Sequence, residues 1–335
     1  MSVAPASRLT GHAAALAETH LLRGLPEDQL LELAPLFFRR ELPAGVTLFR
    51  EGDPGRSMLI LHSGAVEVAR RLPGRELALA AVGATEALGE MALVSGQPRS
   101  ATVRTTLPTV AYELEAGTFA RLRSDGRPVA VELIRRIGEG AVRRLRERTV
   151  GIARSLEEQV GMGPPRLGPS QPARLHAAAN PETDADYLAG ILFFQGLTPA
   201  AVAEFTSGLQ QLDAERGALV VHEGERPRAL LLILRGALET TIRRAERVQR
   251  LRLAGPGRAA AHLGVIDPGS SPVTVRARER SVLLEVPRER LHKMVNSPTR
   301  EDRILTAALH TDVVLALYAA QRPMPEMLAA DWDKR

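Results

Sequence analysis

The chain of 335 residues contains no cysteine, so neither disulfide bonds nor thiolate metal ligands can contribute to its fold. Aromatic residues make up only 3% of the sequence, so its cores must be built mainly from Leu, Val, Ile and Ala. Lysine occurs only as Lys293 and Lys334, and almost all of the 44 basic residues are therefore arginine. The net charge of +5 is modest and spread along the chain, so it does not by itself indicate a nucleic-acid partner.

The sequence also lacks the usual features of export and membrane insertion. Residues 1–22 have neither the basic start nor the continuous apolar stretch of a signal peptide. The longest apolar run, Ile304 to Ala320, is interrupted by His310 and Asp312 and is short for crossing a bilayer. We therefore expect a cytoplasmic protein with no membrane partner, in which this run forms a buried or dimer-forming helix.

No set of residues suited to catalysis stands out. The eight histidines show no metal-binding spacing such as His-x-x-x-His, and no serine lies in a Gly-x-Ser-x-Gly elbow. We therefore expect no enzymatic activity, no metal site and no resident cofactor.

What the sequence does contain, between residues 41 and 114, is a series of short apolar runs separated by Gly and Pro. The runs cover residues 46–49, 58–62, 65–68, 77–82, 101–105 and 109–114. Short strands with frequent Gly turns are typical of a β-sandwich or barrel. A helix is expected after them, from Val129 to Arg148. Gly138 and Gly140 would permit a bend in its middle, because each costs roughly 1 kcal/mol relative to Ala.

The first part of the chain recurs further along at one constant offset, called the repeat offset below. Arg23-Gly24-Leu25 returns as Gln195-Gly196-Leu197, Glu51-Gly52 as Glu223-Gly224, and Thr102-Val103-Arg104 as Thr274-Val275-Arg276. A shared offset over this span indicates two copies of one fold. Residues 161–186 are rich in Gly and Pro, which predicts a linker. We therefore expect a lead-in at 1–20, domain A at 21–150, a linker at 151–186, domain B at 187–310, and a C-terminal helix and tail at 311–335.

One stretch of domain A, residues 88–103, combines groups suited to a phosphate and a ribose. A short helix beginning near Gly89 would point backbone N–H groups at an anion, and Gly89 would let the backbone approach the ligand. Arg99 would add a forked, permanently charged donor for two phosphate oxygens. Glu90 would repel a phosphate, so its natural partner is a sugar hydroxyl.

This stretch resembles the phosphate-binding cassette of the cyclic nucleotide-binding domain family, the family of the catabolite activator protein and the protein kinase A regulatory subunit. The family pattern is matched by Gly89, Glu90, Ala92, Leu93, Arg99, Ser100 and Ala101, with Val103 one place early. The resemblance implies a mainly β fold with flanking α-helices, made of two tandem jelly-roll β-barrel domains. It implies that the ligand-binding residues are Val82, Leu88, Gly89, Glu90, Met91, Ala92, Arg99, Ser100 and Ala101.

The second copy departs from this pattern at the binding positions. At the repeat offset the residues are Ala261 for Gly89, His262 for Glu90, Gly264 for Ala92, Ser271 for Arg99 and Pro272 for Ser100. The phosphate clamp and the ribose acceptor are both lost, and Pro272 has no backbone N–H to offer. We expect domain B to be a retained scaffold that packs, dimerises or receives a signal, although a hydrogen bond from His262 to a ribose stays open.

These observations predict a sensor that binds cAMP, or alternatively cGMP, in domain A and signals to an unknown partner protein without an output domain of its own. Ser100 offers a hydroxyl that can serve either base. One alternative is a scaffold that uses both domains for protein contacts, and a less favoured one is a nucleic-acid-binding transcription regulator. The arginines between residues 135 and 148 more often form a solvated helix face than a phosphate-binding surface. Helices after the barrels could form a homodimer.

Overall fold

The computed structural model describes residues 11–72, 75–160, 175–179, 181–244, 247–322 and 327–328. The chain divides into two compact units, residues 1–137 and 138–335, which are called the first and the second unit below. The division falls within one helix, α5 (Pro128–Val160). The boundaries expected for domains A and B stay predictions, since this division follows contacts rather than the repeat.

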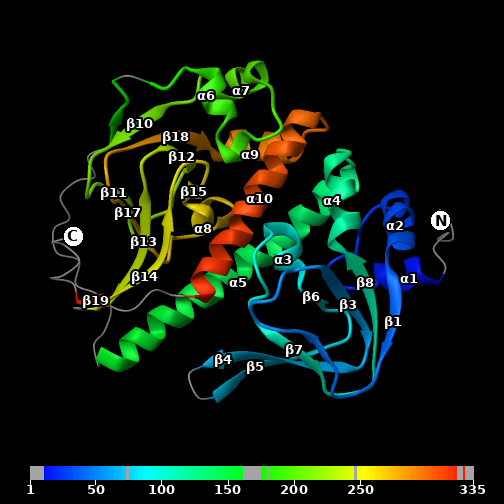
Figure 1. Cartoon of the computed structure of the whole chain (residues 1–335). Coiled ribbons are helices and arrows are strands. Elements are labelled where there is room, and N and C mark those ends of the chain that lie inside the picture. The colour runs from blue at the N-terminus through cyan, green and yellow to red at the C-terminus, as the bar shows by residue number, and fades with distance from the viewer. Residues whose placement is uncertain are drawn as a thin grey trace, which may run out of the picture. The chain divides into compact units, whose positions relative to one another are not determined.

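The first unit contains two four-stranded antiparallel sheets, coloured blue to cyan in Figure 1. One sheet has the strand order β1-β8-β3-β6 and the other β2-β7-β4-β5. The strands are β1 (Phe38–Leu42), β2 (Thr47–Phe49), β3 (Ser57–Ser63), β4 (Ala65–Leu72), β5 (Arg75–Gly83), β6 (Ala87–Leu88), β7 (Thr102–Thr105) and β8 (Thr109–Glu115). Every apolar run that predicted a strand overlaps one of them, which confirms the mainly β class.

Strand β3 shows why the first unit needs helices as well as sheets. Residues Ser57 to Leu61 are all buried, although neighbouring side chains of a strand point to opposite faces. Leu59 and Leu61 join an apolar cluster together with Phe49, Val66, Leu88, Val103 and Ala111. Helices α1 and α3 pack against β3. The helices of this unit are α1 (His12–Ala17), α2 (Glu27–Leu33), the 3-10 helix η1 (Ala34–Leu36), α3 (Glu90–Ser95), α4 (Ala116–Ser124) and the start of α5.

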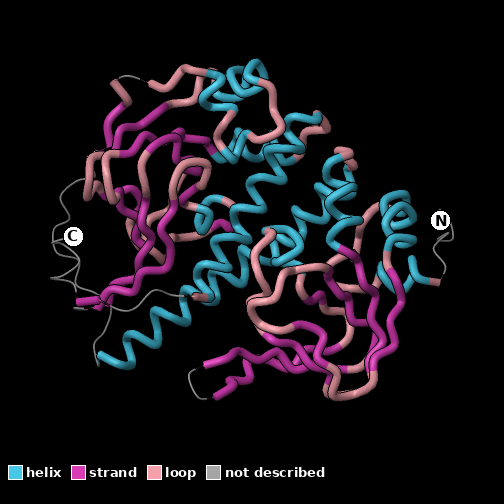
Figure 2. Tube along the Cα trace, viewed as in Figure 1, coloured by secondary structure: helices cyan, strands magenta, loops and turns pink. Residues whose placement is uncertain are grey.

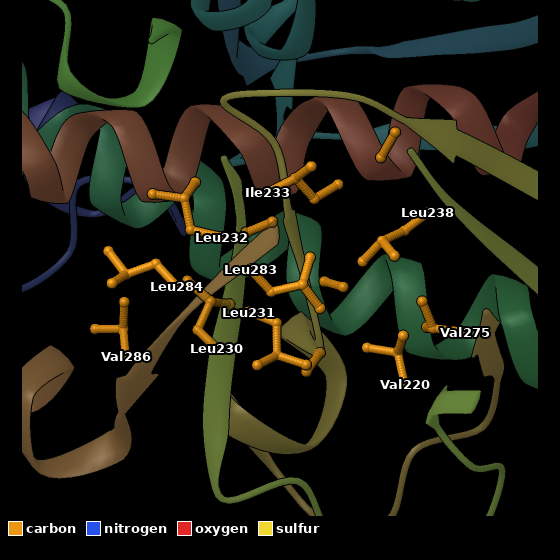
Figure 3. Close-up of a cluster of buried hydrophobic side chains, with 14 of the residues drawn as sticks. Val220, Leu230, Leu231, Leu232, Ile233, Leu238, Val275, Leu283, Leu284 and Val286 are labelled. Carbon is orange, nitrogen blue, oxygen red and sulfur yellow. The ribbon is translucent and has the colours of Figure 1, made fainter. Parts of the chain in front are cut away.

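The second unit repeats this plan with two five-stranded antiparallel sheets. Figure 2 draws the strands of both units in magenta. The strand orders are β15-β12-β18-β10-β9 and β11-β17-β13-β14-β19. The strands of these sheets are β9 (Leu175–Ala177), β10 (Gln211–Ala214), β11 (Leu219–Val221), β12 (Ala229–Arg235), β13 (Leu238–Arg244), β14 (Arg247–Ala254), β15 (Ala259–Ala260), β17 (Thr274–Ala277), β18 (Ser281–Pro287) and β19 (Met327–Leu328). The short strand β16 (Asp267–Pro268) is in neither sheet. The aliphatic side chains of β12 and β18 gather into one buried cluster (Figure 3).

Helix α10 (Arg300–Gln321) is the longest helix that lies wholly within the second unit, among the described residues. It is long and apolar enough to cross a membrane by length and composition alone, yet 56% of its most apolar window is buried inside the protein. His310 and Asp312 are both buried on it. The other helices of this unit are α6 (Ala185–Ala189), the 3-10 helix η2 (Leu192–Phe194), α7 (Pro199–Thr206), α8 (His262–Val265), α9 (Arg288–Val295) and the rest of α5.

Helix α5 extends further than the sequence predicts and is helical through Gly138 and Gly140. Two glycines at about 1 kcal/mol each do not end a helix whose buried face, here Ile137 and Ala141, is held by packing. A Cβ atom on Gly138 would lie 2.5 Å from the Cβ of His310, so this glycine permits close packing. The helix occupies residues 151–160 of the expected linker, whereas residues 161–174 and 180 lie outside the described residues.

Candidate functional site

The first cassette, residues 89–101, begins at a glycine in the left-handed conformation. Gly89 has φ 77° and ψ 5° and precedes helix α3, a backbone geometry that glycine adopts without a Cβ penalty. A Cβ atom at this position would also lie 2.2 Å from Nη1 of Arg99. The backbone turn therefore favours glycine here, and the approach of the arginine leaves no room for a Cβ atom.

Arg99 lies across the start of the cassette and is only 4% exposed. Its Nη1 donates to the carbonyl oxygen of Gly89 at 3.1 Å, and its Nη2 donates to that of Ser57 at 2.7 Å. The guanidinium carbon lies 3.6 Å from the centroid of the Phe49 ring, a cation–π contact. These contacts fix the side chain in position but leave its full positive charge, so a cation is held ready for an anion.

Burial lowers the pKa of Arg99 to about 10, while the carboxylates of Glu90, Glu113 and Asp53 favour its charged form. The guanidinium therefore stays charged at neutral pH despite the loss of water around it. A buried cation of this kind gains from any additional anion that can reach it.

The structure brings the predicted cassette residues together. Glu90 is 6% exposed at the start of α3 and lies near enough to Arg99 to favour its charge. Met91 and Ala92 are buried on the same helix, and Ser100 and Ala101 are half-buried directly after Arg99. Leu88 belongs to the apolar cluster between the sheets, and Val82 packs against that cluster. The roles of these residues in binding stay predictions.

The loop between β2 and β3 holds Arg99 from the other side, which the sequence alone did not reveal. The Arg99 amide donates to the carbonyl oxygen of Asp53 at 2.8 Å, and the Gly52 amide donates to that of Arg99 at 3.0 Å. A Cβ atom on Gly55 would lie 2.4 Å from the Cβ of Ala92, so the loop also packs tightly on α3. The recurrence of Glu51-Gly52 in the second copy was the signal for this role.

The second cassette, residues 261–273, keeps the start and the loop contacts of the first, but its helix α8 is non-helical at Leu263 and Gly264. Ala261 is left-handed, with φ 69° and ψ 21°, as Gly89 is. The Ser271 amide donates to the carbonyl oxygen of Glu225 at 2.7 Å, and the Gly224 amide donates to that of Ser271 at 2.7 Å. These bonds are the counterparts, at the repeat offset, of the two that hold Arg99. The Ser271 side chain, however, is much shorter than that of Arg99, and its hydroxyl donates to the carbonyl oxygen of Val273 at 2.9 Å.

An aspartate from helix α10 sits beside the second cassette. Asp312 is 2% exposed, and its carboxylate accepts from Nη2 of Arg252 at 2.6 Å and from the Ala259 amide at 2.9 Å. It also lies 2.9 Å from Nε2 of His262. Burial raises the pKa of Asp312, but the charge of Arg252 and the hydrogen bonds from His262 and Ala259 outweigh it and hold that pKa well below its usual value.

The space left at the second cassette is small. A cavity of about 50 Å³ is lined by His262 and Ser271 on one side and by Ala316 and Ala320 of α10 on another. It has room for a few water molecules but not for a nucleotide. This geometry favours the expectation that the second cassette takes no nucleotide.

The groups that the first cassette offers a ligand are a guanidinium, a carboxylate and backbone amides. Across the described part of the chain, no group of three or more His, Asp or Glu residues could hold a metal ion. The set suits a phosphate joined to a sugar, because the cation and the carboxylate would each find a partner of the right polarity.

Comparison with known families places the repeat in a wider context. Residues 39–125 and 211–297 each match the family described as the cyclic nucleotide-binding domain. Together the two matches cover just over half of the chain. Their starts and their ends are separated by the same distance in sequence, which is the repeat offset.

Several curated proteins are similar to parts of this chain. Glutaminase 1 of Bradyrhizobium diazoefficiens is 40% identical over 121 residues, which are 36% of this chain and 19% of that protein. The CRP-like cAMP-activated global transcriptional regulator of Mycobacterium tuberculosis is 27% identical over 139 residues, 41% of this chain and 60% of the regulator. The cAMP-dependent protein kinase regulatory subunit of Blastocladiella emersonii is 29% identical over 113 residues, 33% of this chain and 28% of the subunit. Each match spans less than two thirds of the relative.

Proposed function

This chain belongs to the cyclic nucleotide-binding domain family, and we propose that it is a regulatory protein that binds one cyclic nucleotide, in the first cassette. The proposed ligand is cAMP, with cGMP as the second candidate. Two of the relatives are named for cAMP and for regulation, which supports this choice. The relative named as a glutaminase matches over only 19% of its own length, so it gives no reason to propose catalysis here.

The observation that carries the proposal is the buried, charged Arg99 beside Glu90 and Gly89. In the proposed complex the guanidinium donates to the phosphate oxygens of the ligand. The ribose 2′-hydroxyl donates to the Glu90 carboxylate, which an anionic phosphate would avoid. One cation and one carboxylate in one cassette thereby orient a phosphate and a sugar at the same time.

Two features support a single site per chain. Ser271 occupies the position equivalent to Arg99, and its hydroxyl donates to the carbonyl oxygen of Val273. Asp312 already supplies an anion to the polar groups around the second cassette. In this proposal the second unit passes the signal to a partner protein in the cytoplasm. A scaffold that binds no nucleotide is the competing function.

The decisive experiment is calorimetric titration of the full chain with cAMP and with cGMP. We expect saturable binding of one nucleotide per chain and tighter binding of cAMP. Absence of binding by both nucleotides would favour the scaffold instead. Two nucleotides per chain would overturn the assignment of the second cassette.

A further inference from the structure

The first unit contains a cavity of about 500 Å³ that involves the cassette only through Arg99. The other predicted nucleotide-binding residues do not line it. Its apolar wall comes from strands β1, β2 and β3 and the turn before β2, and consists of Leu42, Val46, Leu48, Phe49 and Leu59. A volume of this size lies within the range of about 300–1,000 Å³ typical of small-molecule sites.

The charged groups of this cavity are predominantly basic. They are Arg40, Arg50, Arg56 and Arg99, against the two carboxylates of Asp53 and Glu113. Arg40 is paired with Glu113 at 2.6 Å. Arg50 and Arg56 are exposed, and within the described residues their side chains form no hydrogen bond or ion pair. The cavity therefore has an excess of two positive charges, and two of its cations have no partner among the described residues.

We propose that this cavity is a second ligand site, which takes a small phosphomonoester with an apolar organic body. A phosphomonoester carries a charge of about −1.5 to −2 at neutral pH, which matches the excess positive charge of the lining. Arginine forks bind phosphate oxygens in pairs, and the apolar body would be buried against Leu42, Leu48 and the Phe49 ring.

The second unit offers an internal comparison for this site. At the repeat offset, Leu212 stands for Arg40, His222 for Arg50 and Ser271 for Arg99, and only Arg56 keeps its charge, as Arg228. The basic set is therefore a feature of the first unit and is not imposed by the shared fold. The two sites share Arg99, but Arg50 and Arg56 lie outside the cassette and belong to this cavity alone.

Titration of the full chain with phenyl phosphate tests the proposal. We expect saturable binding at one site, with a Kd no weaker than about 1 mM. The double variant Arg50→Ala/Arg56→Ala should weaken this binding about tenfold, since each charge-assisted hydrogen bond contributes to affinity. The matched control is Arg121→Ala/Arg123→Ala on α4, which removes the same charge away from the cavity and should change affinity less than about twofold.

Two further measurements keep the outcome unambiguous. Glu90→Gln should weaken the binding of cAMP more than that of phenyl phosphate, because Glu90 does not line the cavity. Inorganic phosphate should bind more weakly than phenyl phosphate, because it buries no apolar surface. The proposal fails if phenyl phosphate does not bind at about 10 mM. It also fails if Arg121→Ala/Arg123→Ala weakens phenyl phosphate binding as much as Arg50→Ala/Arg56→Ala does. Loss of phenyl phosphate binding in Glu90→Gln, or equal affinity for inorganic phosphate and phenyl phosphate, would overturn it as well.

Discussion

In the first unit, Arg99 of the cassette donates to the carbonyl oxygens of Gly89 and Ser57, and the carboxylates of Glu90, Glu113 and Asp53 favour its charge. In the second unit, an aspartate from α10 reaches the Ala259 amide and the His262 ring, and Arg252 neutralises it. Both cassettes therefore have a charged group buried beside them, but the two groups are of opposite sign: the guanidinium of Arg99 in the first and the carboxylate of Asp312 in the second. We propose that the ligand supplies the anion that meets Arg99, whereas in the second unit Asp312 of the chain itself meets Arg252.

This difference lies in the side chains and in the helix of the cassette, because α3 is regular over Glu90–Ser95 whereas α8 is non-helical at Leu263 and Gly264, but not in the contacts of the loop. The two hydrogen bonds that hold residue 99 to the β2–β3 loop are present again at residue 271, with similar lengths. The left-handed residue that starts each cassette is present in both units as well. A retained left-handed turn with its loop hydrogen bonds is therefore no sign of a ligand, and binding must be judged from the groups at the centre of the cassette.

Replacement of Asp312 should have the largest effect. Asp312→Asn keeps the shape but removes the charge that neutralises Arg252, and breaking a buried ion pair costs about 3–5 kcal/mol. We expect the free energy of unfolding of the full chain, measured in denaturant by circular dichroism, to fall by that amount. Glu301→Gln, at the exposed start of the same helix, is the matched control and should change it little.

The same pair predicts a pH dependence. The pKa of Asp312 is lower in the folded chain than the value of about 3.9 expected in the unfolded chain, so its contribution to stability is present above that pH. The contribution is lost as the pH falls below about 4, towards the folded pKa. The stability difference between wild type and Asp312→Asn should therefore shrink on acidification. A difference that stays constant down to strong acid would contradict the ionised Asp312.

Replacement of Arg99 should have the next largest effect, on nucleotide binding. Removing one partner of a desolvated charge pair costs about 2–5 kcal/mol, so Arg99→Ala should weaken cAMP binding by more than tenfold in calorimetric titration. Ser271→Ala, the matched change in the second cassette, should leave affinity unchanged. Equal affinity of wild type and Arg99→Ala would remove the arginine from the phosphate site.

Replacement of Glu90 tests whether the first cassette, unlike the second, recognises the ribose 2′-hydroxyl of the ligand. A hydrogen bond to a charged group contributes about 1.5–3 kcal/mol, so the wild type should prefer cAMP over 2′-deoxy-cAMP. Glu90→Gln should reduce that preference, whereas His262→Gln in the second cassette should not. If the wild type binds both ligands equally, Glu90 does not contact the 2′-hydroxyl.

Ala261 gives the smallest expected effect. A left-handed alanine costs roughly 1 kcal/mol relative to glycine, so Ala261→Gly should stabilise the chain by up to about that amount. Ala260→Gly, one residue earlier in β15 and not left-handed, should destabilise it. Thermal or denaturant unfolding of both variants provides the measurement. Destabilisation by both changes would show that the turn is not strained.

Much of the fold could be predicted from the sequence because its signals are local. Apolar runs between Gly and Pro located the strands, and the constant repeat offset showed the duplication. Gly89, Glu90 and Arg99 lie close together in the sequence, so one motif contained the centre of the candidate site. The predicted helix ends at Arg148, whereas α5 continues to Val160. Thr149, Val150 and Gly151 are weak helix formers, and the packing of the buried Ala153 and Leu156 sustains the helix beyond them.

The rest of the candidate site could not be predicted because it depends on distant residues. Asp312 lies far from His262 in the sequence, and no spacing rule links a helix to a loop so far away. Phe49 and Ser57 contact Arg99 from strands β2 and β3 through a ring face and a carbonyl oxygen, and neither forms a recognisable motif. The identities of His262 and Ser271 showed that binding groups were lost, but not what replaced them.

The left-handed alanine at position 261 also stands against the conformational preference of its own residue type. An alanine has no local reason to adopt this turn, whereas Gly89 at the equivalent position of the first cassette has one. The turn of the second cassette is therefore held by the structure around it, and its own residue does not specify it.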